Sequence, residues 1–163
     1  MVLTDLARLN PAELLALHAR IGDELRQRGV VRSANNPTGD LAEHLFCRAY
    51  GWKQAGNSNP MADASDRAGR LFQIKGRRQT RRQPSRILGA MRGLPEGGFD
   101  FLAAVLFEPD YRVRKAAIIP HPLVHSNSRY IEYTNSWRFN LSDAVWALDG
   151  VEDATEKLRA VTI

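Results

Sequence analysis

The sequence predicts an α/β or α+β fold in which a central mixed β-sheet is flanked by helices. Three observations support this prediction. Residues 10–29 and 36–51 carry apolar side chains at helical spacing, each between a start signal and a stop signal. Residues 63–75 alternate around a glycine, as the two strands of a hairpin do. Residues 99–107 are mostly apolar, which is typical of a strand buried on both faces.

The length favours one domain, because 163 residues can enclose a sizeable core. We expect an N-terminal helical flank at 1–32, a core at 33–120 and a C-terminal extension at 121–163. Pattern alone does not decide between α/β and α+β.

The first helix has clear boundaries. Asn10 is a good N-cap, Pro11 suits the first turn, Glu13 completes a capping box, and Gly29 ends the helix. Its apolar residues recur at helical spacing, so we expect the helix to lie against the core as a structural flank.

The second helix, 36–50, ends at Gly51 and fills one broad arc with apolar side chains. Glu43 lies just past the edge of that arc. A carboxylate at such a boundary can reach a cleft between helix and sheet. The alternative is a solvated surface residue, the usual position of Glu on a helix.

The hairpin has a three-residue loop, 67–69, which needs a residue with positive φ at its last position. Gly69 supplies it. The register that follows sets Asp66 opposite Arg70 on one face of the hairpin.

The same register sets Asp63 directly opposite Gln73, on the face that also carries Lys75. The hairpin therefore offers a carboxylate, an amide and an ammonium together on one surface. Metal-assisted phosphodiester chemistry uses such a combination: an anion holds a divalent cation, and a cation orients water and stabilises developing charge.

The order Glu43, Asp63, Gln73-Ile74-Lys75 resembles the PD-(D/E)XK nuclease superfamily, and most of all the branch with Gln as its second metal-site residue, as in the Mrr-like restriction enzymes. A second likeness, to an uncharacterised bacterial family within this superfamily, covers most of the chain. It rests on the same residues together with Arg32, Asn35, Pro37, Gly39 and Asp40. It implies a fold and no particular substrate.

The resemblance implies a restriction endonuclease-like core at 33–120 and a Mg²⁺-dependent DNA endonuclease. By position, Asp63, Gln73 and Glu43 would line a Mg²⁺ or Mn²⁺ site, and Lys75 would orient the attacking water. Glu43, Asp63, Gln73 and Lys75 are thus the expected catalytic residues. Gln in place of an acid removes one negative charge, which favours one ion over two.

A basic run follows the hairpin. The net charge is +5, and the segment 75–92 contains seven Lys or Arg residues and no Asp or Glu. Such a density of like charge favours an anionic partner, and Arg suits bidentate phosphate contacts. The expected nucleic-acid-binding residues are Arg77, Arg78, Arg81, Arg82 and Arg86. A solvated charged loop is the alternative.

Two other classes of function stay open beside the nuclease. One is a nucleic-acid-binding module on the same fold without catalysis. The other is a protein-interaction domain whose basic face meets an acidic partner. The sequence does not distinguish DNA from RNA. A homodimer is expected only because cutting two strands usually requires two sites.

The chain reads as a cytoplasmic protein with no membrane partner. Its single cysteine, Cys47, cannot form an internal disulfide and fits a reducing compartment. Asp5 and Glu13 interrupt the first residues, which argues against a signal peptide. No stretch approaches the roughly 20 apolar residues that span a bilayer.

The remaining elements are assigned by local pattern. We expect a short helix at 85–92, a strand at 113–119, a strand at 131–141 and a terminal helix at 151–161. Pro120 and Pro122 argue against a regular helix between them and the next strand.

Overall fold

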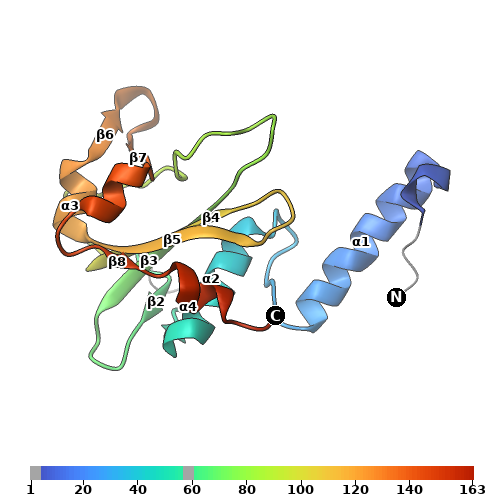
Figure 1. Ribbon diagram of the computed structural model, residues 1–163, viewed down its shortest axis with the longest axis horizontal. Helices are drawn as coiled ribbons and strands as arrows, with labels where there is room; N and C mark the ends of the chain where they lie inside the picture. The colour runs from blue at the N-terminus through green and yellow to red at the C-terminus, as the bar shows by residue number, and fades with distance from the viewer. Residues whose placement is uncertain (1–4, 57–60) are drawn as a thin grey trace.

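The computed structural model describes residues 5–56 and 61–163 and has a mixed α+β architecture (Figure 1). Within that part of the chain, six strands form one sheet in the order β1-β2-β3-β4-β5-β8. The strands are β1 (Lys53–Gln54), β2 (Ala64–Ser65), β3 (Leu71–Arg78), β4 (Phe101–Phe107), β5 (Val113–Pro120) and β8 (Glu152–Asp153). Only β3 and β4 run parallel, and the other neighbours are antiparallel. The predicted central mixed sheet flanked by helices is therefore confirmed.

Helices α2 (Thr38–Tyr50) and α4 (Thr155–Arg159) cover one face of the sheet (Figure 1). The core beneath α2 is built from Leu41, Ala42, Leu45 and Phe46, packed on the inward side chains of β3, β4 and β5. Gly51 ends α2 with a φ of 66°, as its sequence position predicts.

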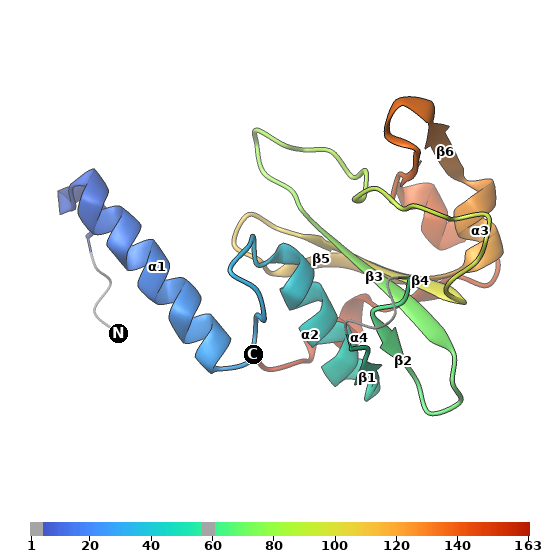
Figure 2. The same cartoon turned by 180° about the vertical axis from the view of Figure 1, so that it is seen from behind.

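The opposite face is covered without a long helix. The connection between β3 and β4, residues 79–100, crosses it (Figure 2) and buries Leu88, Met91 and Leu94. The antiparallel pair β6 (Ser128–Ile131) and β7 (Ser136–Phe139) lies beside this connection. The short helices α3 (His121–Ser126), η2 (Glu132–Thr134) and η3 (Asp143–Ala147) complete that half of the molecule.

Helix α1 (Pro11–Gln27), preceded by η1 (Leu6–Arg8), projects away from the sheet (Figures 1 and 2). Its start matches the prediction, because Asn10 and Glu13 form a complete capping box. Its expected packing is wrong: α1 has no buried residue, and only Leu25, near its end, packs against the core. In the described part of the chain, no helix is long and apolar enough to cross a bilayer.

The helix expected at 85–92 is not formed. The Ser85 hydroxyl accepts a hydrogen bond from the Ile87 amide, and the backbone of Leu88 and Met91 pairs with β7 instead of with itself. The Met91 amide donates to the Trp137 carbonyl at 3.0 Å, and the Trp137 amide donates back at 2.7 Å. The segment is thus extended, because a distant strand satisfies its hydrogen-bonding groups.

Three C-terminal expectations also change. The strand expected at 131–141 is interrupted by a turn at Asn135, which splits the region into β6, η2 and β7. A helix does form after Pro120, because Pro122 falls in its first turn, where a missing N–H costs nothing. The terminal helix is shorter than expected, since β8 pairs with β5 before α4 begins.

Candidate active site

The hairpin of β2 and β3 has the predicted register. Ala64 pairs with Phe72 and Ser65 with Leu71, as predicted. The Asp63 amide donates to the carbonyl of Phe72, the partner of Ala64, at 2.8 Å, so the regular ladder ends at Ala64 and Asp63 lies just beyond it, next to Phe72 and Gln73.

The turn that sets this register is the one expected from the sequence. Gly69 has a φ of +82°, and its amide donates to the Asp66 carbonyl at 3.1 Å. Asp66 and Arg70 form an ion pair of 2.6 Å across the turn. The Arg70 guanidinium lies over the Phe101 ring, on the face of the sheet that α2 covers.

The side chains of β3 divide between the two faces as predicted. Phe72 and Ile74 are buried in the core beneath α2. Gln73 and Lys75 alternate with them and are half-buried, so they lie on the other face. Asp63 precedes the fully buried Ala64 at the end of the regular pairing, and its negative charge acts on Glu43 and Cys47 of α2. Neither Gln73 nor Lys75 has a side-chain hydrogen bond to another residue of the described chain.

Asp63 is held by hydrogen bonds to its carbonyl and to its carboxylate. Its carbonyl accepts a hydrogen bond from the Ala55 amide at 2.8 Å, on β1's side of the hairpin. Its carboxylate oxygen Oδ2 accepts one from the Ile74 amide at 2.7 Å. The carboxylate is therefore fixed in direction by the strand that carries Gln73 and Lys75. Its other oxygen makes no hydrogen bond within residues 5–56 and 61–163.

Glu43 approaches the site from α2 and is only 16% exposed. Its Oε2 accepts hydrogen bonds from Arg32 Nη2 at 2.5 Å and from Gln54 Nε2 at 2.6 Å. Burial raises the pKa of Glu43, and the nearby negative charge of Asp63 raises it further, while Gln54 and Arg32 act to lower it. The pKa of Glu43 is raised on balance, chiefly by burial.

Asp40 fixes the backbone of the segment that contains Arg32. Its Oδ2 accepts hydrogen bonds from the backbone amides of Arg32 at 2.8 Å and Ser33 at 2.7 Å. Burial opposes ionisation of Asp40, yet these hydrogen bonds hold its pKa below the ordinary value. Asp40 thus positions Arg32 through the backbone.

Arg32 and Gln54 were not predicted as site residues. Arg32 is among the residues that carry the family resemblance, but nothing in the sequence linked it to Glu43, eleven positions away. No sequence feature indicated Gln54, because a short edge strand brings it beside Glu43 only in the folded structure.

The residue types suit a divalent cation. Asp63 and Gln73 offer a carboxylate and an amide oxygen from neighbouring strands, and the negative charge of Asp63 near Glu43 is of the kind that a cation relieves. One oxygen of Glu43, however, is already used by Arg32 and Gln54. Within the described residues, no group of three or more His, Cys, Asp or Glu side chains converges on one point. The set fits one ion and not two.

Cys47 lies next to this site but is not a reactive nucleophile. Burial raises the pKa of its thiol to about 11, and the charges of Glu43 and Asp63 contribute to the rise. The thiol is therefore protonated at neutral pH, as expected of a structural cysteine.

The five predicted DNA-contacting arginines fall into two groups. Arg77, Arg78 and Arg86 are tied to the protein. Arg77 donates to the Ser85 carbonyl at 3.3 Å, and Arg78 donates to the Pro109 carbonyl at 2.9 Å while lying over the Tyr111 ring. Arg86 forms an ion pair of 3.0 Å with Asp143, which also binds Lys115.

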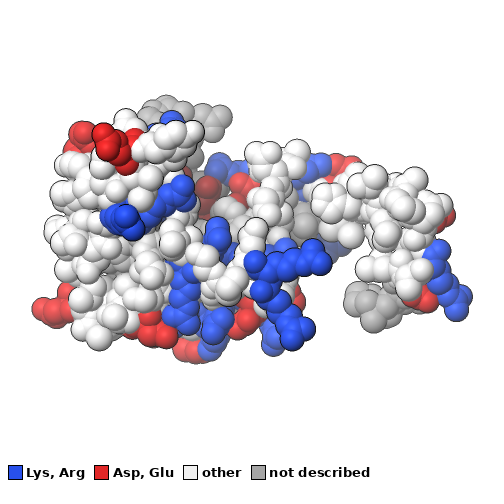
Figure 3. All heavy atoms as spheres, turned by 90° about the horizontal axis from the view of Figure 1, so that it is seen from above, with Lys and Arg blue, Asp and Glu red and all other residues white. Residues whose placement is uncertain are grey.

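Arg81 and Arg82 form the second group. Both are exposed at the start of the β3–β4 connection and have no ion-pair partner in the described chain. Figure 3 looks down on the end of the molecule that carries this connection, and Lys and Arg side chains gather in the middle of that view. Next to it, a pocket of about 300 Å³ is lined by Arg77 and Arg78 together with Thr38, Thr80 and Gln83.

The site therefore combines Gln73 and Lys75 on one face of β3, Asp63 at the end of the neighbouring strand with Glu43 of α2 near it, and arginines along the chain that leaves β3. No protein-family model matches the chain, and no curated protein matches it.

Proposed function

We propose that this protein is a cytoplasmic, divalent-metal-dependent nuclease that hydrolyses phosphodiester bonds of nucleic acid, with DNA as the substrate. The observation that carries the proposal is the hairpin register. It brings Asp63 next to β3, where the Ile74 amide donates to its carboxylate, and Gln73 and Lys75 flank Ile74 on one face of that strand. A carboxylate, an amide oxygen and an ammonium on one rigid strand pair suit hydrolysis of an anionic ester.

Asp63 and Gln73 would hold a Mg²⁺ or Mn²⁺ ion, with the remaining Glu43 oxygen in support. When bound, the ion neutralises charge on the phosphate and polarises its oxygens. The Ile74 amide keeps the Asp63 carboxylate directed at the site, so little reorganisation is needed.

Lys75 orients the attacking water and stabilises the negative charge that grows on the phosphate. The water oxygen forms a bond to phosphorus, one ester P–O bond breaks, and the water proton ends on the released alcohol. Lys75 suits this part because its ammonium makes no ion pair within the described chain and is half-buried beside Gln73.

Arg81 and Arg82 would contact the nucleic-acid backbone directly, because their guanidinium groups are exposed and unpaired within the described residues. Arg77 and Arg78 would bind a phosphate in the pocket next to β3, which their side chains line. Arg86 has a weaker claim, since Asp143 already neutralises it.

Calorimetry with Mn²⁺ tests the metal site apart from catalysis. Asp63→Ala should abolish binding, and Lys75→Ala should retain it. Gln73→Glu is the sharper variant, because it restores an anionic ligand and should tighten binding about tenfold if Gln73 faces the ion. If Gln73→Glu and Asp63→Ala both bind like the wild type, the ion does not use this face.

A second candidate is a nucleic-acid-binding module without catalysis. It is favoured by the ion pair between Glu43 and Arg32, which neutralises one of the two carboxylates. Arg32→Ala distinguishes the two. It should strengthen Mn²⁺ binding if Glu43 supports an ion, and should leave an unreactive domain unchanged.

A further inference from the structure

Helix α1 carries an apolar stripe that no other part of residues 5–56 and 61–163 covers. On a helix with about 3.6 residues per turn, Leu14, Leu17, Ile21 and Leu25 fall along one side. Leu14 is 38% exposed and Ile21 52% exposed, and of the four only Leu25 packs on the core. A helix of this length usually depends on packing for its stability. The stripe therefore calls for a partner.

The described body of the chain does not reach the stripe, because the end of α1 is fixed in direction. Gly29, with a φ of +70°, donates its amide to the Arg26 carbonyl at 2.9 Å, and Val30 donates to the Leu25 carbonyl at 3.0 Å. These two bonds form a Schellman motif, in which Leu25 and Val30 make the usual apolar contact. Val30 and Val31 are buried, so the helix leaves the core in a fixed direction.

The charges of α1 point to a second copy. Most of the charged side chains from Asp5 to Arg28 are paired within the segment: Asp5 with Arg8, Asp23 with Arg26, and Glu24 with Arg28. Glu13 and Arg20 remain without an ion-pair partner in the described chain. They are two turns apart, on the same flank of the stripe, and have opposite sign.

We infer that two copies of this chain form a dimer through α1, with the two helices antiparallel across a two-fold axis. An axis between Leu14 and Leu17 brings these two residues of one copy against the same two of the other. The same axis sets Glu13 of each copy within reach of Arg20 of the other, so both unpaired charges are neutralised twice. A parallel pair would instead align each residue with its own counterpart along the axis and would leave Glu13 and Arg20 apart.

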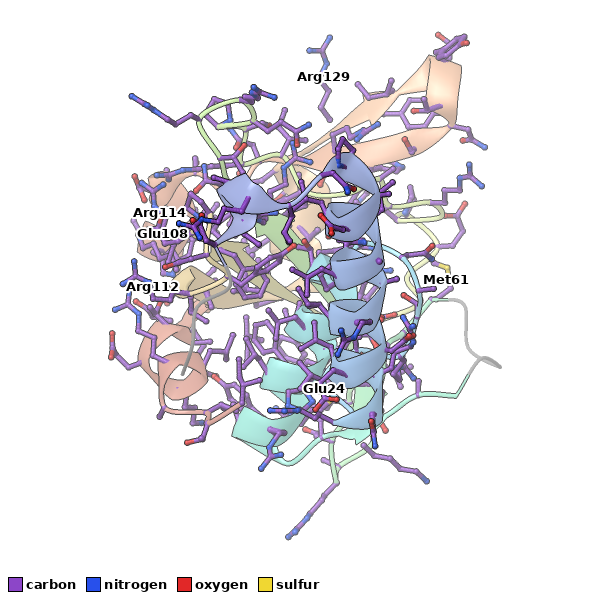
Figure 4. The ribbon with its side chains drawn as sticks, turned by 90° about the vertical axis from the view of Figure 1, so that its right-hand side faces the viewer. Glu24, Met61, Glu108, Arg112, Arg114 and Arg129 are labelled. Atoms are coloured by element: carbon purple, nitrogen blue, oxygen red, sulfur yellow. The ribbon has the colours of Figure 1, made fainter. Side chains whose placement is uncertain are left out.

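The antiparallel dimer would also bring η1 of one copy close to a pocket of the other copy. In an antiparallel pair, the start of one α1 lies beside the end of the other. The C-terminus lies near the end of α1 (Figure 1), and Ile163 there lines a pocket of about 580 Å³ together with the apolar Leu45, Leu158 and Val161 and the charged Glu108, Asp110, Arg112 and Arg159. Figure 4, with α1 in front, shows Glu108, Arg112 and Arg114 beside one another at the β4–β5 turn, to one side of the helix. Leu6, 56% exposed on η1, is the side chain that would enter the pocket.

Light scattering and sedimentation of the full chain over a wide concentration range test the dimer. The wild type should have twice the mass of one chain, and Leu14→Glu/Leu17→Glu should have the mass of one. Ala16→Glu is the matched control, because Ala16 is exposed on the opposite side of α1 and its variant should stay dimeric. Circular dichroism confirms that each variant keeps its helix content. A wild type that is monomeric throughout, or that binds lipid vesicles as a monomer, overturns the inference.

A charge-swap experiment tests the antiparallel geometry. Arg20→Glu and Glu13→Arg should each raise the dimer dissociation constant about tenfold, because two attractive pairs become repulsive. A mixture of the two variants should form heterodimers with near-wild-type affinity, since each Glu then meets an Arg. Glu13→Arg also removes half of the capping box. The mixture does not restore the capping box, so any recovery of affinity in the mixture comes from the Glu–Arg pairs between the two copies. A mixture that dissociates like its components contradicts the antiparallel pair.

Discussion

Removing Arg81 and Arg82 should change how DNA binding responds to salt. Both side chains are exposed and lack an ion-pair partner in the described chain, whereas Arg78 and Arg86 are tied to Tyr111 and Asp143. Free guanidinium groups release condensed counterions when they reach phosphates, so each contributes to the salt dependence of binding.

The magnitude follows from the two guanidinium–phosphate pairs that the double variant cannot form. Each such pair contributes about 0.9 to the slope of log affinity against log salt on duplex DNA, so Arg81→Gln/Arg82→Gln should lower the slope by about 1.8. When salt rises from about 50 to about 200 mM, both proteins lose affinity. The loss should be about 12-fold smaller for the double variant than for the wild type. Sequence preference should not change, because phosphate contacts do not read bases.

Fluorescence anisotropy with a labelled duplex, repeated across a salt series, measures this slope. The matched control is Arg67→Gln/Arg112→Gln, which removes the same charge from the hairpin loop and the β4–β5 turn. It should leave the slope within error of the wild type. Equal slopes for the wild type and Arg81→Gln/Arg82→Gln would refute the placement of DNA along the β3–β4 connection.

Two further predictions concern stability and the thiol. A Cβ at Gly76 would lie 2.8 Å from the Thr38 carbonyl oxygen and 3.1 Å from the Ala42 Cβ. Gly76→Ala should therefore destabilise the fold by about 2 kcal/mol in urea unfolding, whereas Gly39→Ala, with nothing within 4 Å, should not. An equal midpoint for both variants would contradict this packing. Because burial raises the pKa of Cys47 to about 11, its thiol should react slowly with a disulfide reagent at pH near 8 and rapidly after unfolding. Fast reaction of the native protein would show that the thiol is exposed.

The hairpin could be predicted in detail because its determinants are local. Gly69 needs a positive φ, and the alternation of Phe72 and Ile74 with Gln73 and Lys75 allows one register. The boundaries of α1 and α2 were predictable for the same reason. A capping box and two glycines are read within a few residues of each helix end.

The second face of the sheet could not be predicted this way. Leu88, Met91 and Leu94 are spaced three apart, which resembles one side of a helix. The backbone of Leu88 and Met91 pairs with β7, far along the chain, and no local signal indicates that partner. The connection is extended because this tertiary pairing outweighs local propensity.

Part of the candidate site could likewise be predicted from local sequence, and part could not. The positions of Gln73 and Lys75 on one face of β3, and of Asp63 beside that strand, could be predicted because one hairpin holds them. The surroundings of Glu43 depend on Arg32 and Gln54, which reach it from a connector and an edge strand. The packing of α1 was misjudged because an amphipathic pattern predicts an apolar contact without identifying the partner.

The central claim is that Asp63 and Lys75 serve catalysis of phosphodiester hydrolysis, and cleavage of nucleic acid tests it most directly. Supercoiled plasmid and single-stranded DNA are incubated with the wild type, Asp63→Ala and Lys75→Ala, with Mg²⁺, with Mn²⁺ and with chelator. The wild type should cut at least one substrate in a metal-dependent manner, and both variants should lose cleavage by at least about a hundredfold while still binding DNA. A wild type that binds DNA tightly yet cuts neither substrate with either ion would contradict the account and favour the binding module.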